Sequence, residues 1–363
     1  MGAGSEKQNK SALRVHKGVD MPPSVNPNVR DRIRRHRRRI YSVDEYVDGI
    51  LSGNRTILSR AITLLESSLP EHYEKAQAII ERCLRYPTDS VRIGITGVPG
   101  AGKSTFIETL GKHVTSMGRR LAVLAIDPSS SQTGGSILGD KTRMDTLSTD
   151  PNAFIRPSPS AGTLGGVARK TRETIILCEA AGFDTIFVET VGVGQSEVIA
   201  SSMVDFFLLL MLAGAGDELQ GIKRGIMEMA DAIAITKADG TNRIKAEMAK
   251  VEYQNALHLY PMPESGWTPK VLTCSALENW GMADMVLMFN EYVQFTRATG
   301  FFDEWRKKQA IIRMHETISE TLKSSFYNSA EIKEMLPSLE KQLHDGEITS
   351  YIAAKRLLEK YYK

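Results

Sequence analysis

Short runs of apolar residues recur between residues 91 and 274 and predict the strands of a sheet. Most runs are continuous rather than alternating in polarity, so both faces of the sheet should be buried. Helical or irregular stretches separate most of them, an order typical of parallel strands joined by helices. The runs are Val91–Thr96, Leu121–Ile126, Thr185–Val188, Phe206–Leu212, Ala232–Thr236 and Val271–Cys274. We therefore expect an α/β fold, with a mostly parallel central sheet flanked by helices.

Helical patterns lie on both sides of this region. Ser42-Val43-Asp44-Glu45 has the form of a capping box, which predicts the start of a helix. Pro70 suits the first turn of a further helix, in which the side chains of Ile79, Ile80, Cys83 and Leu84 would face the protein interior. After residue 290, apolar residues recur every three or four positions at Ile311, Met314, Ile318, Leu322 and Phe326. Two more helices are expected, around Glu331–His344 and through Tyr351–Tyr361. We thus divide the chain into a tail (1–40), an N-terminal helical segment (41–88), an α/β domain (89–290) and a C-terminal helical segment (291–363).

The composition excludes several classes of protein. With 42% hydrophobic and 25% charged residues, the chain is neither disordered nor collagen-like. The three cysteines lie far apart and form no C-x-x-C pair, which favours a reducing compartment and speaks against structural zinc. No run of about 18 apolar residues predicts a membrane span, and the first residues have no secretory apolar region. We expect a cytoplasmic protein with no membrane partner.

The positive charge is concentrated in the tail. Residues 1–40 hold eleven Lys or Arg against three Asp or Glu, a local charge of +8 in a chain whose total is +3. The cluster Arg30–Arg39 is open to two interpretations, an arm for nucleic acid or an acidic partner, and a solvated, partly disordered tail. No aromatic residues are interleaved for base stacking, which favours the tail. We therefore expect no nucleic-acid partner.

A phosphate-binding motif follows the first predicted strand. Gly97-Val98-Pro99-Gly100-Ala101-Gly102-Lys103-Ser104 fits G-x-x-x-x-G-K-[ST], and a helix-compatible run begins at Thr105. Glycines let the backbone wrap closely, so that N–H groups point at phosphate oxygens. Lys103 should reach the β- and γ-phosphates, and the Ser104 hydroxyl should ligate Mg²⁺. We expect residues 97–105 to bind a nucleotide.

Acidic residues near the ends of other strands are candidates to hold the metal. Asp127 follows one predicted strand and Glu189 another, at the sheet edge where the phosphate loop lies. Asp140 lies in a glycine-containing loop, and Mg²⁺ favours a few carboxylates together with phosphates and water. After Glu189, Gly192 is placed to bring a backbone N–H to a γ-phosphate, as in a switch loop. The candidate catalytic residues are Lys103, Asp140, Glu189 and Gly192; the candidate metal ligands are Ser104, Asp127, Asp140 and Glu189.

The base site is predicted at two later strand ends. Thr236-Lys237-Ala238-Asp239 ends one strand, and Ser275-Ala276-Leu277 follows the next. A carboxylate at Asp239 accepts hydrogen bonds from N1–H and the exocyclic amine of guanine but faces an acceptor in adenine, so it should select guanine. Lys237 can lie over the base, and a backbone N–H near Ala276 can meet the guanine oxygen. This pattern usually begins with Asn, where this chain has Thr236.

Together these segments resemble the MeaB/ArgK/MMAA family of P-loop GTPases. The resemblance covers about residues 41–363 and is densest over 91–281. It rests on the phosphate loop and several longer strings: Ala125–Ser130, Gly134–Met144, Arg156–Pro159, Gly162–Gly166, Glu189–Glu197 and Ala213–Lys223.

The resemblance implies a function that the motifs alone do not. It implies a GTPase that binds GTP, GDP and Mg²⁺, with Asp127, Asp140 and Glu189 positioning the metal and the switches. It implies a further switch at Ala213–Lys223 and a homodimer joined by the C-terminal helices. It also implies a chaperone of adenosylcobalamin-dependent methylmalonyl-CoA mutase, or of a related acyl-CoA mutase, that controls cobalamin delivery and protects the mutase.

Other interpretations remain open. A nickel-delivery GTPase would share the fold, a small-molecule kinase would share the phosphate loop, and a binding module would act through the arginine-rich tail. No residue is assigned to position the attacking water, although Gln195 is a candidate. Lys141 and Arg143 could stabilise the charge that develops on the phosphate. We expect slow intrinsic hydrolysis that accelerates when a partner orders the loops.

Overall fold

Strands and helices alternate along most of the chain after Val91. The computed structural model describes residues 41–67, 69–86, 89–126, 144–157, 164–190, 195–214 and 224–362. Val43–Lys363 form one unit, which is considered by itself. The candidate residues Asp127, Asp140, Lys141, Arg143 and Gly192 lie outside the described residues, as does the arginine cluster of the tail.

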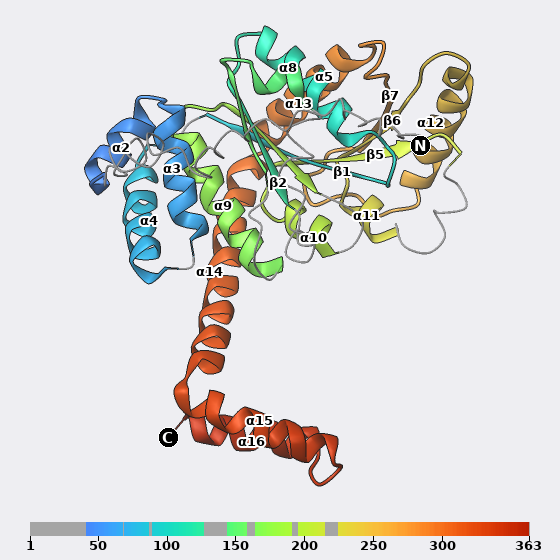
Figure 1. Cartoon of the computed structure of the whole chain (residues 1–363). Helices are drawn as coiled ribbons and strands as arrows, with labels where there is room; N and C mark the ends of the chain where they lie inside the picture. Colours follow the sequence, from blue (N-terminus) through green and yellow to red (C-terminus); the bar gives the residue numbers. More distant parts are fainter. Residues whose placement is uncertain are drawn as a thin grey trace, which may run out of the picture. The chain divides into compact units, whose positions relative to one another are not determined.

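A sheet of parallel strands forms the centre of the unit, as predicted (Figure 1). Its described strands lie in the order β3-β2-β4-β1-β5-β6-β7. Because β1 lies between β4 and β5, the loop after β1 lies where the chain crosses from one half of the sheet to the other. The strands are β1 (Val91–Gly97), β2 (Leu121–Ile126), β3 (Ala153–Arg156), β4 (Thr185–Thr190), β5 (Phe206–Leu212), β6 (Ala232–Thr236) and β7 (Lys270–Thr273).

Six of these strands correspond to the predicted apolar runs, and β3 was missed. β2, β4 and β6 are buried along their whole length, which explains their continuous apolar pattern. β3 has only four residues, two of them partly exposed, and it pairs with β2 at the edge of the sheet. A strand this short has too few buried positions to produce a recognisable pattern.

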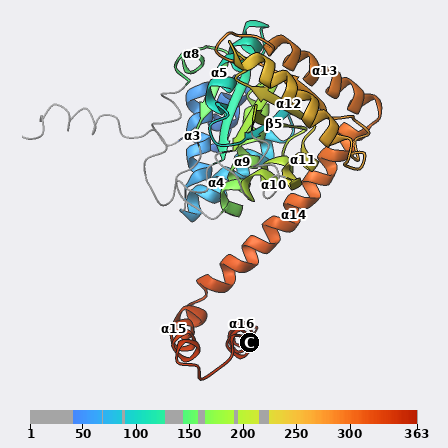
Figure 2. The same cartoon turned by 90° about the vertical axis from the view of Figure 1, so that its right-hand side faces the viewer.

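Helices cover both faces of the sheet. Figures 1 and 2 show α5 and α13 on one face and α9, α10 and α11 on the other. On the first of these faces, the side chains of Phe106 on α5 and Phe289 on α13 are buried. The helices of this region that lie within the described residues are α5 (Lys103–Ser116), α8 (Asp145–Ser148), α9 (Leu164–Ala180), α10 (Gln195–Ser201), α11 (Arg224–Met229), α12 (Asn242–Leu257) and α13 (Met282–Ala298).

In the described part of the chain, three helices precede the sheet: α2 (Val43–Leu51), α3 (Arg55–Glu66) and α4 (Pro70–Cys83). Asn54 caps α3 by accepting hydrogen bonds from the first-turn N–H groups, which separates α3 from α2. Pro70 begins α4, as its fixed φ predicts. Leu84 was expected to face inward with Ile79, Ile80 and Cys83, but it is exposed because it follows the last turn of α4.

Three further helices follow α13: α14 (Phe301–Asn328), α15 (Ala330–His344) and α16 (Ser350–Tyr361) (Figure 2). The first turns of α14 are tied to the residues before β5, because Trp305 Nε1 and Gln309 Nε2 both donate to the Val204 carbonyl, at 2.9 and 2.7 Å. α15 and α16 share a small core of their own, formed by Ile332, Leu339, Ala353 and Leu357. Among the described helices, none combines the length and the apolar character that crossing a membrane requires.

Candidate active site

The phosphate loop connects β1 to α5 and depends on two glycines. A Cβ atom at Gly97 would lie 2.6 Å from the carbonyl oxygen of Leu210 on β5, so no side chain fits there. Gly102 has a φ of +79°, which favours glycine. Two backbone hydrogen bonds tighten the turn, from Val98 N to Leu210 O (3.2 Å) and from Ala101 N to Val98 O (3.1 Å). The result is a tight loop in front of a helix N-terminus, where backbone dipoles favour an anion.

Lys103 lies over this loop. Its Nζ donates to the carbonyl oxygen of Gly97 at 3.0 Å. Burial lowers the pKa of Lys103, while the negative charges of Glu189 and Glu197 act against this effect. A partly buried ammonium group beside the loop is suited to contact phosphate oxygens.

Glu189 reaches the same edge from the neighbouring strand. It pairs in register with Ile95 of β1 and is only 4% exposed. The next residue, Thr190, donates its hydroxyl to Thr96 Oγ1 at 2.8 Å, which fixes the end of β4 against β1. The negative charge of Glu189 acts on Lys103 in the direction that raises its pKa, so Glu189 belongs to the electrostatic surroundings of the phosphate loop.

The donor atoms in this region fit a hard cation. Ser104, in the first turn of α5, has a hydroxyl and Glu189 has a carboxylate, both oxygen ligands of the kind Mg²⁺ prefers. Asp127 directly follows β2, whose last residue, Ile126, pairs with Thr190. Within the described ranges, no three His, Cys, Asp or Glu side chains form a group that could hold a metal by themselves. Mg²⁺ in a nucleotide site also takes phosphate oxygens and water as ligands.

The predicted base segment is bonded directly to the phosphate loop. Thr236, the last residue of β6, donates its hydroxyl to the Ala101 carbonyl at 2.8 Å, with Met211 O also near at 3.2 Å. A Cβ atom at Gly102 would lie 3.8 Å from Cε of Lys237, so the lysine stem passes over the loop. Thr236 thus joins the two halves of the site at the position where the motif usually has Asn.

Asp239 is held by the second base segment. The hydroxyl of Ser275 donates to Asp239 Oδ2 at 2.9 Å and accepts a hydrogen bond from Glu278 N at 3.1 Å. The backbone of Ala238 bonds to Cys274 O at 3.0 Å, which fixes β6 against the residues after β7. The structure therefore brings Lys237 and Asp239 together with Ser275, Ala276 and Leu277, although the Leu277 side chain is exposed.

Three further residues support the site and were missed by the sequence analysis. Thr109 on α5 donates to the Ala276 carbonyl at 3.2 Å, and Asn242 donates to the Lys237 carbonyl at 2.6 Å. The Asn242 bond helps to hold Lys237 at a φ of +56°, a conformation that few residues other than glycine adopt. Glu197 acts on Lys103 from α10. The one sequence signal for any of these three residues was that Asn242 follows Lys237 by only five positions.

Comparison with known proteins identifies the relatives of this chain. A family model described as "Methylmalonyl Co-A mutase-associated GTPase MeaB" matches residues 58–331. A probable GTPase of Mycobacterium tuberculosis is 48% identical over 320 residues, which cover 87% of this chain and 95% of the relative. The GTPase ArgK of Escherichia coli is 45% identical, with 78% and 86% covered.

A mammalian relative and a solved structure agree with this result. The mouse protein named "Methylmalonic aciduria type A homolog, mitochondrial" is 44% identical, and the match covers 88% of this chain and 79% of the mouse protein. A crystal structure described as an LAO/AO transport system kinase superposes with a TM-score of 0.70 at 33% identity, over 88% of this chain and 98% of the other.

Proposed function

The chain belongs to the MeaB family of methylmalonyl-CoA mutase-associated GTPases, and we propose that it is a Mg²⁺-dependent GTPase chaperone of an adenosylcobalamin-dependent methylmalonyl-CoA mutase. It would control cobalamin delivery to the mutase and protect the mutase from inactivation. A GTPase that serves another acyl-CoA mutase or a metalloenzyme is the alternative. Its cytoplasmic location remains part of the proposal, consistent with three buried cysteines that are all free thiols.

The chain is a GTPase, as its relatives are. The observation that best supports guanine recognition is the bonding of the base segments, in which Thr236 binds Ala101 and Ser275 binds Asp239. This arrangement holds a carboxylate at a fixed position relative to the phosphate loop. An ATP-dependent kinase would have no use for a fixed carboxylate at this position, because adenine presents an acceptor to it.

Hydrolysis divides into roles for a small set of residues. Water attacks the γ-phosphorus, the bond to the β–γ bridging oxygen breaks, and GDP and inorganic phosphate are released. Lys103 and the N–H groups of the phosphate loop offset the negative charge on the phosphate oxygens. Ser104, Asp127, Asp140 and Glu189 would hold Mg²⁺, which when bound further offsets this charge. Gly192 would bring a backbone N–H to the γ-phosphate.

The partner would distinguish the GTP-bound from the GDP-bound form through the conformation of segments beside the nucleotide site. α10 begins at Gln195, three residues after Gly192, and its Glu197 acts electrostatically on Lys103. The proposed second switch, Ala213–Lys223, follows β5 directly. A γ-phosphate that orders these segments would change the surface offered to the mutase, and hydrolysis would release it.

The partner is inferred from the relatives. The family description names methylmalonyl-CoA mutase, and the mouse relative is named for methylmalonic aciduria. The central claim about the partner therefore needs a direct binding measurement. We expect the chain to bind cobalamin-loaded methylmalonyl-CoA mutase with an affinity that differs at least about tenfold between GDP and a non-hydrolysable GTP analogue, measured by calorimetry.

Equal affinity for the mutase with GDP and with the GTP analogue would contradict the proposed nucleotide switch. Binding to a different acyl-CoA mutase, with none to this one, would favour the alternative partner. A matched control is Lys103→Ala, which should bind the mutase as the nucleotide-free protein does, whichever nucleotide is added.

We also propose a homodimer joined through the C-terminal helices. Ile311, Met314, Ile318 and Leu322 form a stripe along α14 whose members are 49–60% exposed in the single chain. Tyr351 and Tyr362 add exposed aromatic surface on and after α16. Apolar surface of this extent on long helices is typical of protein interfaces.

A further inference from the structure

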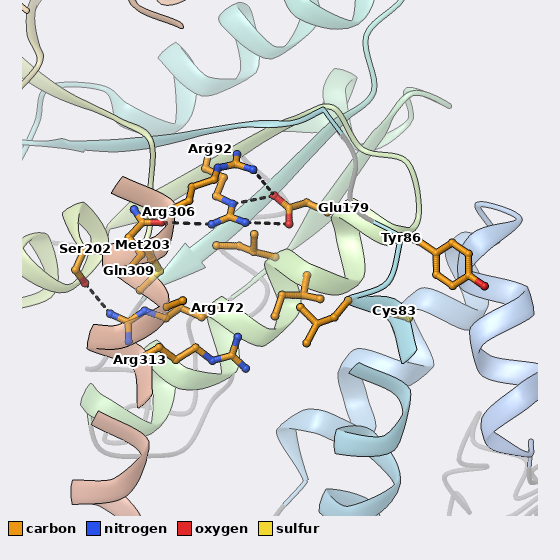
Figure 3. A pocket seen from close by; sticks show the side chains of 14 residues that line it. Cys83, Tyr86, Arg92, Arg172, Glu179, Ser202, Met203, Arg306, Gln309 and Arg313 are labelled. Atoms are coloured by element: carbon orange, nitrogen blue, oxygen red, sulfur yellow. Dashed lines mark hydrogen bonds and ion pairs between the residues drawn. The ribbon is translucent and has the colours of Figure 1, made fainter. Parts of the chain in front are cut away.

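A pocket of about 250 Å³ opens beside Arg92, at the end of β1 opposite to the phosphate loop. The end of α4, helix α9, the connection from α10 to β5, and α14 surround it (Figure 3). Four arginines from three different elements line it: Arg92, Arg172, Arg306 and Arg313. Neither the nucleotide site nor the proposed partner surface includes this pocket.

Two of the arginines are committed to buried carboxylates. Arg92 makes a bidentate pair with Glu179, from Nε at 2.8 Å and Nη2 at 3.0 Å. Arg306 makes a similar pair with Asp205, from Nε at 2.9 Å and Nη2 at 2.6 Å. The first pair joins β1 to α9, and the second joins α14 to the residue before β5. Bidentate contacts of this kind are the strong form of a guanidinium–carboxylate pair. Arg92 and Arg306 are therefore structural.

Arg172 and Arg313 are paired differently. Arg172 is 8% exposed and donates from both Nη1 and Nη2 to Glu316, but this carboxylate lies toward solvent at 43%. Arg313 approaches Glu173 at 3.6 Å, which is longer than a hydrogen bond. Both arginines line the same pocket, and Figure 3 shows them close together beneath the Arg92–Glu179 pair.

The two guanidinium groups repel each other. Burial lowers the pKa of Arg172, and the positive charge of Arg313 lowers it further. Two like charges that lie close together away from water have an unfavourable electrostatic energy. An anion that contacts both charges would lower this energy. Planar guanidinium forks are also the groups best suited to bind carboxylate or phosphate oxygens.

The remaining wall and the volume limit what could bind. Ile175, Ile176, Leu84 and Met203 give the pocket an apolar side. Its volume is below the range of roughly 300–1,000 Å³ found for sites of drug-sized ligands, which favours a ligand smaller than a nucleotide. The chemistry that fits is an oxyanion head group on a short apolar body.

We propose that this pocket is a second ligand site, which binds a small organic anion through Arg172 and Arg313 and packs its apolar part against Ile175 and Ile176. The site is linked to the nucleotide site through Arg172, whose Nη2 donates to Ser202 Oγ at 2.6 Å. Ser202 directly follows α10, the helix that starts at the predicted γ-phosphate loop. The bound anion therefore biases the position of α10 and acts as an effector of GTP hydrolysis.

The test uses butyrate and inorganic phosphate as probes on the full chain with GDP bound, by calorimetry at constant ionic strength. Butanol is the uncharged control. We expect saturable binding of at least one of the two anions and none of butanol; which anion binds identifies the head group. Arg313→Gln should weaken that binding at least about tenfold, because a charge-assisted contact is lost.

The matched control is Lys307→Gln, which removes the same charge from an exposed position on α14 and should change the affinity by less than about twofold. Arg313 is partly exposed, so its variant should fold, and an unchanged melting temperature will verify this. The site does not exist if neither anion binds saturably, if butanol binds as well as butyrate, or if Arg313→Gln binds like the unaltered protein. Since no mutase is present, these outcomes are independent of the proposed chaperone function.

Discussion

At the scale of single residues, Thr236 shows how a departure from a motif can preserve its geometry. The guanine motif usually begins with Asn, and from the sequence alone Thr236 left base recognition to Asp239. In the structure, the buried Thr236 hydroxyl bonds to the Ala101 carbonyl in the phosphate loop. The residue therefore positions the predicted base segment against the phosphate loop.

Replacing Thr236 by Val keeps the shape and removes this bond. Because one neutral hydrogen bond is worth about 1 kcal/mol, we expect the Kd for GTP to rise about fivefold. Thr236→Ser keeps the hydroxyl and should bind GTP nearly as the unaltered protein does. Calorimetric titration distinguishes the two variants. Equal affinities would show that the hydroxyl has no positioning role.

Asp239 determines the choice of base in this account. Asp239→Asn loses the acceptor pair for guanine but matches xanthine, which has an oxygen where guanine has its amine. We expect the affinity for GTP to fall by at least about 100-fold, with a gain for the xanthine nucleotide, because two charge-assisted hydrogen bonds are lost. Competition binding with both nucleotides measures the shift. Unchanged GTP affinity would contradict the assigned contact.

At the scale of elements, the sequence predicted what depends on local pattern. The bounds of β2, β5 and β6 were predicted to the residue, since continuous apolar runs produced them. The phosphate loop was predicted because its glycines satisfy local backbone and close-packing requirements. The Thr236–Ala101 bond was not, because it joins segments 135 positions apart across the sheet. Likewise, the position of Arg313 beside Arg172 depends on how α14 packs against α9.

The start of β6 should make stability depend on pH. Asp231 Oδ2 accepts a hydrogen bond from Phe207 N at 2.8 Å, and burial raises the pKa of Asp231 to about 7. Because the folded pKa lies above the unfolded one, its contribution is complete below about pH 4 and is lost as the pH rises through about 7. We expect this group to lower the free energy of unfolding by roughly 1–4 kcal/mol across that interval.

Denaturant unfolding at several pH values measures this effect. Asp231→Asn removes the titrating group, so the part of the slope between about pH 4 and pH 7 that Asp231 contributes should disappear. A variant with the same slope as the unaltered protein would show that Asp231 titrates normally.

At the scale of the whole molecule, the apolar stripe on α14 predicts association. Ile318→Glu places a charge in the middle of the proposed dimer interface and should weaken dimerisation by at least about 100-fold, because an unpaired charge would be buried. Lys323→Glu, at an exposed position outside the stripe, is the control. Sedimentation analysis gives the masses, and GTP affinity should stay unchanged in both variants. A monomeric unaltered protein, or a dimeric Ile318→Glu variant, would contradict the interface.

We propose that the chain hydrolyses GTP under the control of a partner enzyme. The rate of GTP hydrolysis tests the guanine selectivity and the partner together. The rate should be measured with and without cobalamin-loaded methylmalonyl-CoA mutase, with ATP as the control nucleotide. We expect slow hydrolysis by the chain alone and stimulation by the mutase of at least about tenfold, with GTP and not with ATP. Bound GTP with an unstimulated rate would contradict the chaperone role toward this mutase, and a preference for ATP would contradict the base site at Asp239.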